Sequence, residues 1–237
     1  MKLLHLFPDM MNLYGEYANL LLLQRCLEEL GEKVECHTLL MGETREIAGY
    51  DLYFMGAGTE RKQKLALEAL RPYGEVLKKT HEEGKVFLFT GNSFELLGKS
   101  VKDAQGKRYE GLGMFSYDTE EGDRRIVGDA LGSCPLFSQA VVGFMNKCSK
   151  TTGVKVPLFT LQMGFGNEAK NSGEGVYEGN FFGTHLTGPI LMKNPGLLRE
   201  ILRRLTDKPV EEVSVPYLQQ AYETTSKALQ NRLESMK

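Results

Sequence analysis

Short apolar runs alternate with longer amphipathic segments over the first ninety residues. Strands are predicted at residues 2–7, 33–39, 52–55 and 86–89. Residues 16–30 repeat leucine and tyrosine near helical spacing before Gly31, and two further helices are predicted between Arg61 and Glu83. The strand at Val86–Phe89 is apolar throughout, as expected when both faces of a sheet are covered. This alternation predicts a mostly parallel sheet flanked by helices.

The second half of the chain has a different pattern. Strand-like stretches at residues 124–129, 140–146, 156–162 and 181–186 follow one another without long helices and are separated by glycine-rich turns. Two helices then close the chain, one beginning at Asn194-Pro195 and the last spanning about 216–236. We therefore predict one α/β domain over residues 1–237, with antiparallel strands added to a parallel core.

Composition narrows the choice of partners. Lys and Arg number 29, and Asp and Glu number 31, so neither a nucleic acid nor an anionic membrane surface is expected to bind. The apolar run Met1–Phe7 stops at Pro8, which is too short for a secretory signal or a spanning helix, and predicts a cytoplasmic protein without membrane insertion. The four cysteines and four histidines show no metal-binding spacing, and we expect neither a metal nor a cofactor.

Two predicted strands end in small residues, at the edge where ligands gather in sheets of this kind. Gly56–Gly58 precedes a helix, so its backbone N–H groups would suit an anion or an oxyanion. A tight turn without a ligand explains the same residues. Gly91–Ser93 resembles the strand-to-helix elbow on which hydrolases hold a serine or cysteine nucleophile. The pattern alone does not decide which residue stands at the apex of this elbow.

Five segments make the comparison with known proteins specific. They are Met11–Asn19, Phe54–Arg61, Phe94–Lys99, Gly143–Asn146 and Gly183–Leu191. Their order and spacing are similar to the GatD-type glutaminase subunit of lipid II isoglutaminyl synthase, a class I glutamine amidotransferase related to the cobyric acid synthase (CobB/CobQ) type. The resemblance implies a flavodoxin-like core with an antiparallel extension. It also implies a Mur-ligase-like partner of the MurT type, which uses ATP and ammonia to amidate the lipid II stem-peptide glutamate in cell-wall synthesis.

The family's catalytic dyad is substituted in this chain. Aligned on the family motif, Gly91 stands at the cysteine position and Glu95 at a glutamine, while Thr187 stands at the histidine and His185 at a tyrosine. Glycine supplies no nucleophile, and threonine cannot act as a base near neutral pH. We therefore predict a binding or scaffolding subunit without glutaminase activity. Such a subunit would stabilise the structure of the ligase, pass free ammonia to it, or sense glutamine without cleaving it.

An active hydrolase with a relocated Ser93–His185 dyad is the alternative. His185 lies two positions before Thr187 and would point to the same face of an extended strand. A helix-capping serine and a satisfied, buried histidine are simpler explanations of these residues. Cys134 and Cys148 are less favoured as nucleophiles, because neither follows a strand-turn-helix with small neighbours.

Arg125 matches a family arginine that holds the α-carboxylate of glutamine, a task that suits the bidentate guanidinium. A surface arginine is the alternative, because Arg124 adjoins it. The predicted site for glutamine consists of Gly56, Ala57, Gly58, Asn92 and Arg125.

Overall fold

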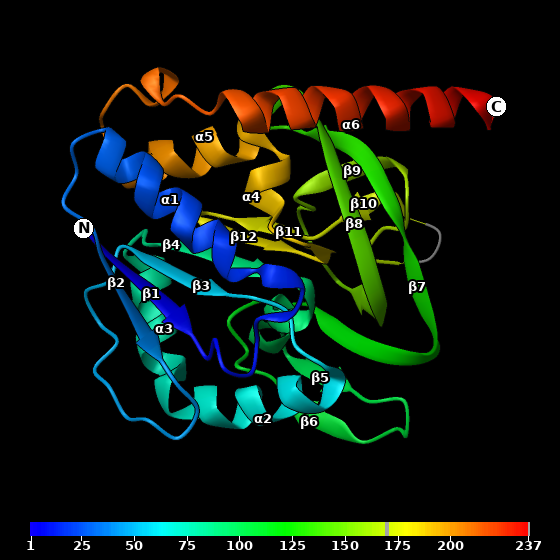
Figure 1. Cartoon of the computed structure of the whole chain (residues 1–237). Helices are drawn as coiled ribbons and strands as arrows, with labels where there is room; N and C mark the ends of the chain where they lie inside the picture. Colours follow the sequence, from blue (N-terminus) through cyan, green and yellow to red (C-terminus); the bar gives the residue numbers. More distant parts are fainter. Residues whose placement is uncertain (169–170, 237) are drawn as a thin grey trace.

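The computed structural model describes residues 1–168 and 171–236, which form two β-sheets with helices around them (Figure 1). The first sheet has the order β11-β12-β4-β3-β1-β2. Its strands are β1 (Lys2–Leu6), β2 (Glu35–Leu39), β3 (Leu52–Met55), β4 (Val86–Thr90), β11 (Val176–Glu178) and β12 (Phe181–Thr184). Neighbours pair in parallel except β11, which is antiparallel to β12. The order β2-β1-β3-β4-β12 is that of flavodoxin-like sheets, which confirms the predicted parallel core.

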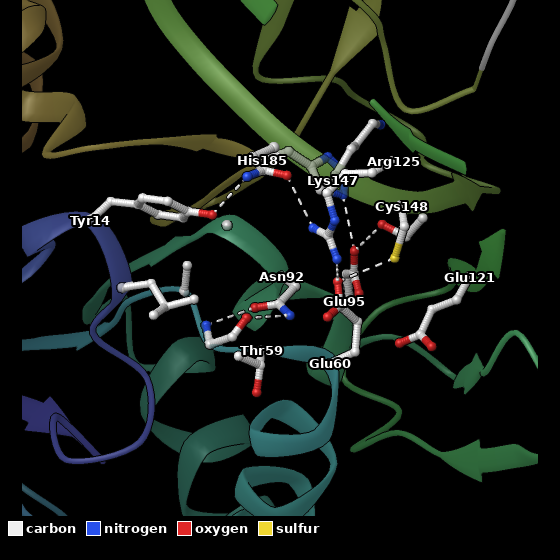
Figure 2. A pocket seen from close by; sticks show the side chains of 16 residues that line it. Tyr14, Thr59, Glu60, Asn92, Glu95, Glu121, Arg125, Lys147, Cys148 and His185 are labelled. Carbon is white, nitrogen blue, oxygen red and sulfur yellow. Dashed lines mark hydrogen bonds and ion pairs between the residues drawn. The ribbon is translucent and has the colours of Figure 1, made fainter. Parts of the chain in front are cut away.

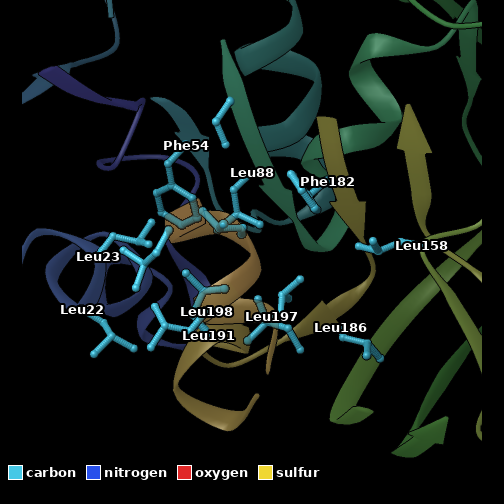
Figure 3. Close-up of a cluster of buried hydrophobic side chains, with 14 of the residues drawn as sticks. Leu22, Leu23, Phe54, Leu88, Leu158, Phe182, Leu186, Leu191, Leu197 and Leu198 are labelled. Atoms are coloured by element: carbon cyan, nitrogen blue, oxygen red, sulfur yellow. The ribbon is translucent and has the colours of Figure 1, made fainter. Parts of the chain in front are cut away.

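Helices cover both faces of this sheet. They are α1 (Tyr17–Glu29), α4 (Ile190–Lys193) and α5 (Pro195–Leu205) on one face, with α2 (Glu60–Leu70) and α3 (Gly74–Glu82) on the other. Alternate side chains of β3 divide between the two layers. Leu52 and Phe54 belong to the cluster under α1 and α5 (Figure 3), whereas Tyr53 and Met55 belong to the cluster under α2 and α3. Both faces of β3 are therefore buried, which explains its uninterrupted apolar sequence.

The remaining strands form a second sheet. They are β5 (Ser100–Lys102), β6 (Arg108–Glu110), β7 (Asp118–Cys134), β8 (Phe137–Thr152), β9 (Phe159–Met163), β10 (Gly173–Glu174) and β13 (Leu186–Thr187). Neighbours in this sheet pair antiparallel except β5 and β7, which are parallel. The predicted strands at 124–129 and 140–146 are the central parts of the long β7–β8 hairpin. Helix α6 (Pro216–Ser235) lies along this hairpin and buries Tyr222 and Leu229 against Leu131 and Val142 (Figure 1). Among the described residues, no helix combines the length with the apolar character that crossing a bilayer requires.

The two sheets meet where β12 leads through His185 into β13. Residue Thr184 pairs with Thr90 at the end of β4, and Thr187 pairs with Phe144 of β8. The short 3-10 turns η1 (Leu13–Gly15) and η3 (Gly91–Leu97) adjoin this junction, and η2 (Arg71–Tyr73) and η4 (Val210–Glu212) lie elsewhere. The carboxyl ends of the parallel strands thus face the second sheet, which is where a ligand site is expected.

Candidate functional site

The turn after β4 has the backbone of a nucleophile elbow but carries a glycine. Gly91 has φ +63°, in the left-handed region that favours glycine. A Cβ atom placed on Gly91 would lie 2.4 Å from Cβ of Ala57 and 3.3 Å from Cγ2 of Thr187. Gly91, Ala57 and Thr187 therefore meet at one point between the two sheets. None of these three residues carries a thiol or an imidazole, so this point offers neither a nucleophile nor a proton shuttle.

The amide of Asn92 ties the elbow to the loop after β3. Its Oδ1 accepts from the Gly58 N–H at 3.0 Å, and its Nδ2 donates to the Gly58 carbonyl at 3.0 Å. The Gly58 N–H is therefore already used and is not free to hold an oxyanion. Gly56 was predicted as part of the site but is not among the residues that line the pocket described below. A Cβ there would lie 2.7 Å from Cβ of Glu16 and 2.8 Å from the Met11 carbonyl oxygen. Gly56 is thus required for close packing.

The structure does not join Ser93 to His185. The Ser93 hydroxyl is fully buried and lies within hydrogen-bond distance of two carbonyl oxygens, at 2.9 Å from Met55 and 2.8 Å from Thr90. Both ring nitrogens of His185 contact carboxylates instead. Neither residue is left with the geometry of a nucleophile and its base, so the relocated dyad lacks support among the described residues.

His185 lies between two fully buried glutamates. Its Nε2 is 3.1 Å from Glu95 Oε1 and its Nδ1 is 3.1 Å from Glu174 Oε1, and the His185 side chain is only 1% exposed. Ser149 Oγ donates to Glu95 at 2.5 Å, and Gln63 Nε2 donates to it at 2.6 Å. Burial opposes ionisation of Glu95, but His185 and these donors lower its pKa. The elbow is therefore backed by a buried ionic network.

A pocket of about 180 Å³ opens beside the elbow (Figure 2). This volume is below the roughly 300–1,000 Å³ of sites for drug-sized ligands, and suits a molecule the size of an amino acid. The predicted residues Ala57, Gly58, Gly91, Asn92 and Arg125 line it. They are joined there by Tyr14, Glu60, Glu95, Glu121, Asn146, Lys147, Cys148, Ser149 and His185, among others. No three His, Cys, Asp or Glu side chains in residues 1–168 and 171–236 are arranged to hold a metal ion.

Carboxylates of the pocket are paired with basic side chains. Arg125 Nη2 donates to Glu60 within the pocket, and Glu121 forms an ion pair with Lys64, which lies outside the lining. The Cys148 thiol donates to Glu60 at 3.3 Å. Burial and the Glu60 carboxylate raise the pKa of Cys148 to about 12, so its thiolate is scarce at neutral pH. Cys148 thus lies in the pocket without the electrostatic setting of a nucleophile.

Glu16 is a buried carboxyl directly behind the elbow. It accepts hydrogen bonds from the Thr90 hydroxyl and from the Gly188 N–H, the latter at 2.8 Å. Thr90 and Gly188 are the chain neighbours of Gly91 and Thr187, so Glu16 joins the two strand ends that meet here. Burial raises the pKa of Glu16 to about 7, although these hydrogen bonds oppose the rise.

The raised pKa of Glu16 predicts a pH-dependent stability. The folded chain holds this proton more tightly than the unfolded chain, so the free energy of unfolding falls as the pH rises from 4.5 through 7. Between pH 5 and pH 8 we expect Glu16 to account for a loss of about 2–3 kcal/mol. Urea unfolding of the wild type and of Glu16→Gln at both pH values measures this difference. An equal pH dependence in the two proteins would show that Glu16 is not the titrating group.

Sequence reasoning missed the partners of the site residues. Glu174 and Lys147 carried no signal, because each lies in a polar strand segment far along the chain from the elbow. The one available sign was the double substitution at Glu95 and His185, where two neutral family residues are both replaced by ionisable ones. Such a joint change indicates an ion pair, and the structure places these two side chains in contact.

Sequence similarity relates the chain to known amidotransferases. Residues 2–195 match the CobB/CobQ-like glutamine amidotransferase domain. The chain is 30% identical over 220 residues to the GatD subunit of lipid II isoglutaminyl synthase (glutamine-hydrolyzing) of Streptococcus pneumoniae (strain ATCC BAA-255 / R6), covering 91% of this chain and 85% of that one. It is also 30% identical over 213 residues to the GatD subunit of Staphylococcus aureus (strain N315), covering 90% and 86%.

A crystal structure of a glutamine amidotransferase is similar in fold. The TM-score is 0.52, and the match covers 85% of this chain and 98% of that chain. The sequences are 16% identical, so this likeness bears on the fold alone.

Proposed function

Because the chain belongs to the CobB/CobQ-like glutamine amidotransferase family, we propose that it is the amidotransferase-like subunit of an enzyme that amidates lipid II, and that it does not itself hydrolyse glutamine. The two curated relatives are subunits of lipid II isoglutaminyl synthases, and each matches over most of its length. The substrate of the complex is inferred from them.

The meeting of Gly91, Ala57 and Thr187 carries the proposal. Hydrolysis of a side-chain amide in this family requires a thiolate that attacks the carbonyl carbon and an imidazole that moves the proton. Here the Cβ of Ala57 fills the space that a Gly91 side chain would need, and a threonine methyl borders that space. The packing around Gly91 therefore leaves no room for the side chain of a nucleophile. A cysteine at this position would need at least one further substitution.

The rest of the site supports binding without cleavage. The pocket keeps a guanidinium, an amide and several carboxylates at its wall, and its size suits an amino acid. Two other candidate nucleophiles near the elbow are unsuited to attack. Ser93 donates to the backbone, and the raised pKa of Cys148 keeps that thiol protonated. The subunit thus acts as a scaffold and ligand sensor in the complex.

A Mur-ligase-like subunit of the MurT type is the expected partner. It would supply ATP-dependent activation of the stem-peptide glutamate and would accept ammonia from solution or from another source. The relatives are named as subunits, which supports an obligatory partner for this chain.

Reconstitution tests this function. The chain is purified with a Mur-ligase-like protein of the same cell and supplied with lipid II, ATP and either L-glutamine or ammonium chloride. We expect a stable complex in which ammonium supports amidation and glutamine does not. Equal amidation from glutamine would contradict the proposal, and failure of the two proteins to associate would refute the assigned partner.

A further inference from the structure

A row of hydrogen-bonded side chains crosses the pocket. At one end the Tyr14 hydroxyl accepts from Asn146 Nδ2 at 2.9 Å, and Asn146 Oδ1 accepts from Arg125 Nη1 at 3.1 Å. The other terminal nitrogen of Arg125 donates to Glu60, which also accepts from the Cys148 thiol. Figure 2 shows Tyr14 and Cys148 at the two ends of this row. The row joins η1, the β7–β8 hairpin and the start of α2, which are far apart in sequence.

One end of the row is held in a strained conformation. Tyr14 has φ +63° and ψ 17°, although it is a bulky residue that rarely adopts this region. Residues in such conformations persist where the surrounding structure holds them, and they gather at ligand sites and switches. The strained backbone of Tyr14 indicates that the surrounding structure holds this row of side chains in place as part of the pocket.

Among the described residues that line this pocket, Arg125 is the exposed basic side chain. Its side chain is 44% exposed. Lys147 and His185, the other basic side chains of the described lining, are engaged deeper in the fold. Lys147 donates to the Gly166 carbonyl at 2.6 Å, and His185 lies between two carboxylates. A guanidinium binds a ligand carboxylate best through two parallel N–H donors. Here both terminal nitrogens of Arg125 are already engaged, one of them by the carboxylate of Glu60.

We propose that Glu60 is an internal competitor for this pocket, whose carboxylate must leave Arg125 before a small carboxylate-bearing ligand of the amino-acid class binds. The inference rests on the proposed function, in which the pocket binds without cleaving. Glu60 begins α2, whose cap is the Thr59 hydroxyl, so its side chain can turn to solvent without unwinding the helix. Glu60 thereby sets the affinity of the pocket.

Binding of L-glutamine and L-glutamate is measured by titration calorimetry on the full chain and on Glu60→Gln. The glutamine side chain at position 60 has the size of the glutamate and keeps an oxygen that can accept the hydrogen bond from the Cys148 thiol. It lacks the negative charge that holds Arg125. We expect binding to both ligands to tighten by about tenfold, the equivalent of about 1.4 kcal/mol. Arg125→Gln should abolish binding in either background.

Glu121→Gln is the matched control. Glu121 lines the same pocket but pairs with Lys64, so relief of negative charge in general would tighten binding in this variant as well. Unchanged or weaker binding by Glu60→Gln, or an equal gain in Glu121→Gln, would overturn the competition, provided thermal unfolding shows that each variant is folded. So would absence of binding in every folded variant. None of these outcomes bears on glutamine hydrolysis or on assembly with a ligase, which are measured separately.

Discussion

Replacing Gly91 with cysteine should destabilise this protein and should not, by itself, produce a glutaminase. A side chain at φ +63° costs about 1–2 kcal/mol. The new Cβ would also lie 2.4 Å from Cβ of Ala57, and forcing an extra atom into a packed site costs about 1–3 kcal/mol. We therefore expect the free energy of unfolding to fall by about 2–5 kcal/mol in urea titrations.

The Ala57→Gly and Gly91→Cys double variant separates these two costs. Removing the Ala57 methyl relieves the contact but leaves the backbone strain, so the double variant should be more stable than the sum of the single changes predicts. A coupling energy of about 0.5–3 kcal/mol is typical of residues in direct contact. Strict additivity would mean that Ala57 does not occupy the space of a Gly91 side chain.

Replacing His185 with alanine should be among the most damaging single changes in the chain. The substitution leaves Glu95 and Glu174 buried without the imidazole that lies 3.1 Å from each. Removing one partner of a buried charged pair costs about 3–5 kcal/mol. Chemical unfolding at pH 7 measures this loss directly.

Two further variants make the test specific. His37 is 37% exposed and its Nδ1 is 3.0 Å from the Tyr50 hydroxyl, so His37→Ala should cost no more than about 1 kcal/mol. Glu95→Gln combined with His185→Tyr restores the neutral residues expected at these positions in the family. This double variant should be more stable than His185→Ala. If His185→Ala cost as little as His37→Ala, the buried network would not be a source of stability.

Much of the fold could be predicted because its signals are local. The strand Leu52–Met55 was predicted with its observed bounds, since a wholly buried strand is apolar at every position. The β7–β8 hairpin is longer than predicted, because its outer part contains polar residues around Glu120–Asp123 whose pairing depends on the partner strand. The register shift between Glu121 and Ile126 also leaves no mark in the hydrophobic pattern.

The candidate site was less accessible to sequence reasoning. Gly91 and Thr187 were found by aligning motifs, and the structure brings them together. The contact of Ala57 with the elbow was not predictable, because it depends on how closely two loops approach. The pairing of Arg125 with Glu60 was missed for the same reason, since each side chain alone resembles an ordinary surface charge.

Release of glutamate from L-glutamine tests the central claim most directly. The chain is assayed alone and together with the Mur-ligase-like protein proposed as its partner, beside the glutamine-hydrolyzing Streptococcus pneumoniae relative as the positive control. We predict no release above the uncatalysed rate in either state. Turnover that is lost in Ser93→Ala, or in Cys148→Ala, would contradict the claim and would identify the residue that attacks glutamine.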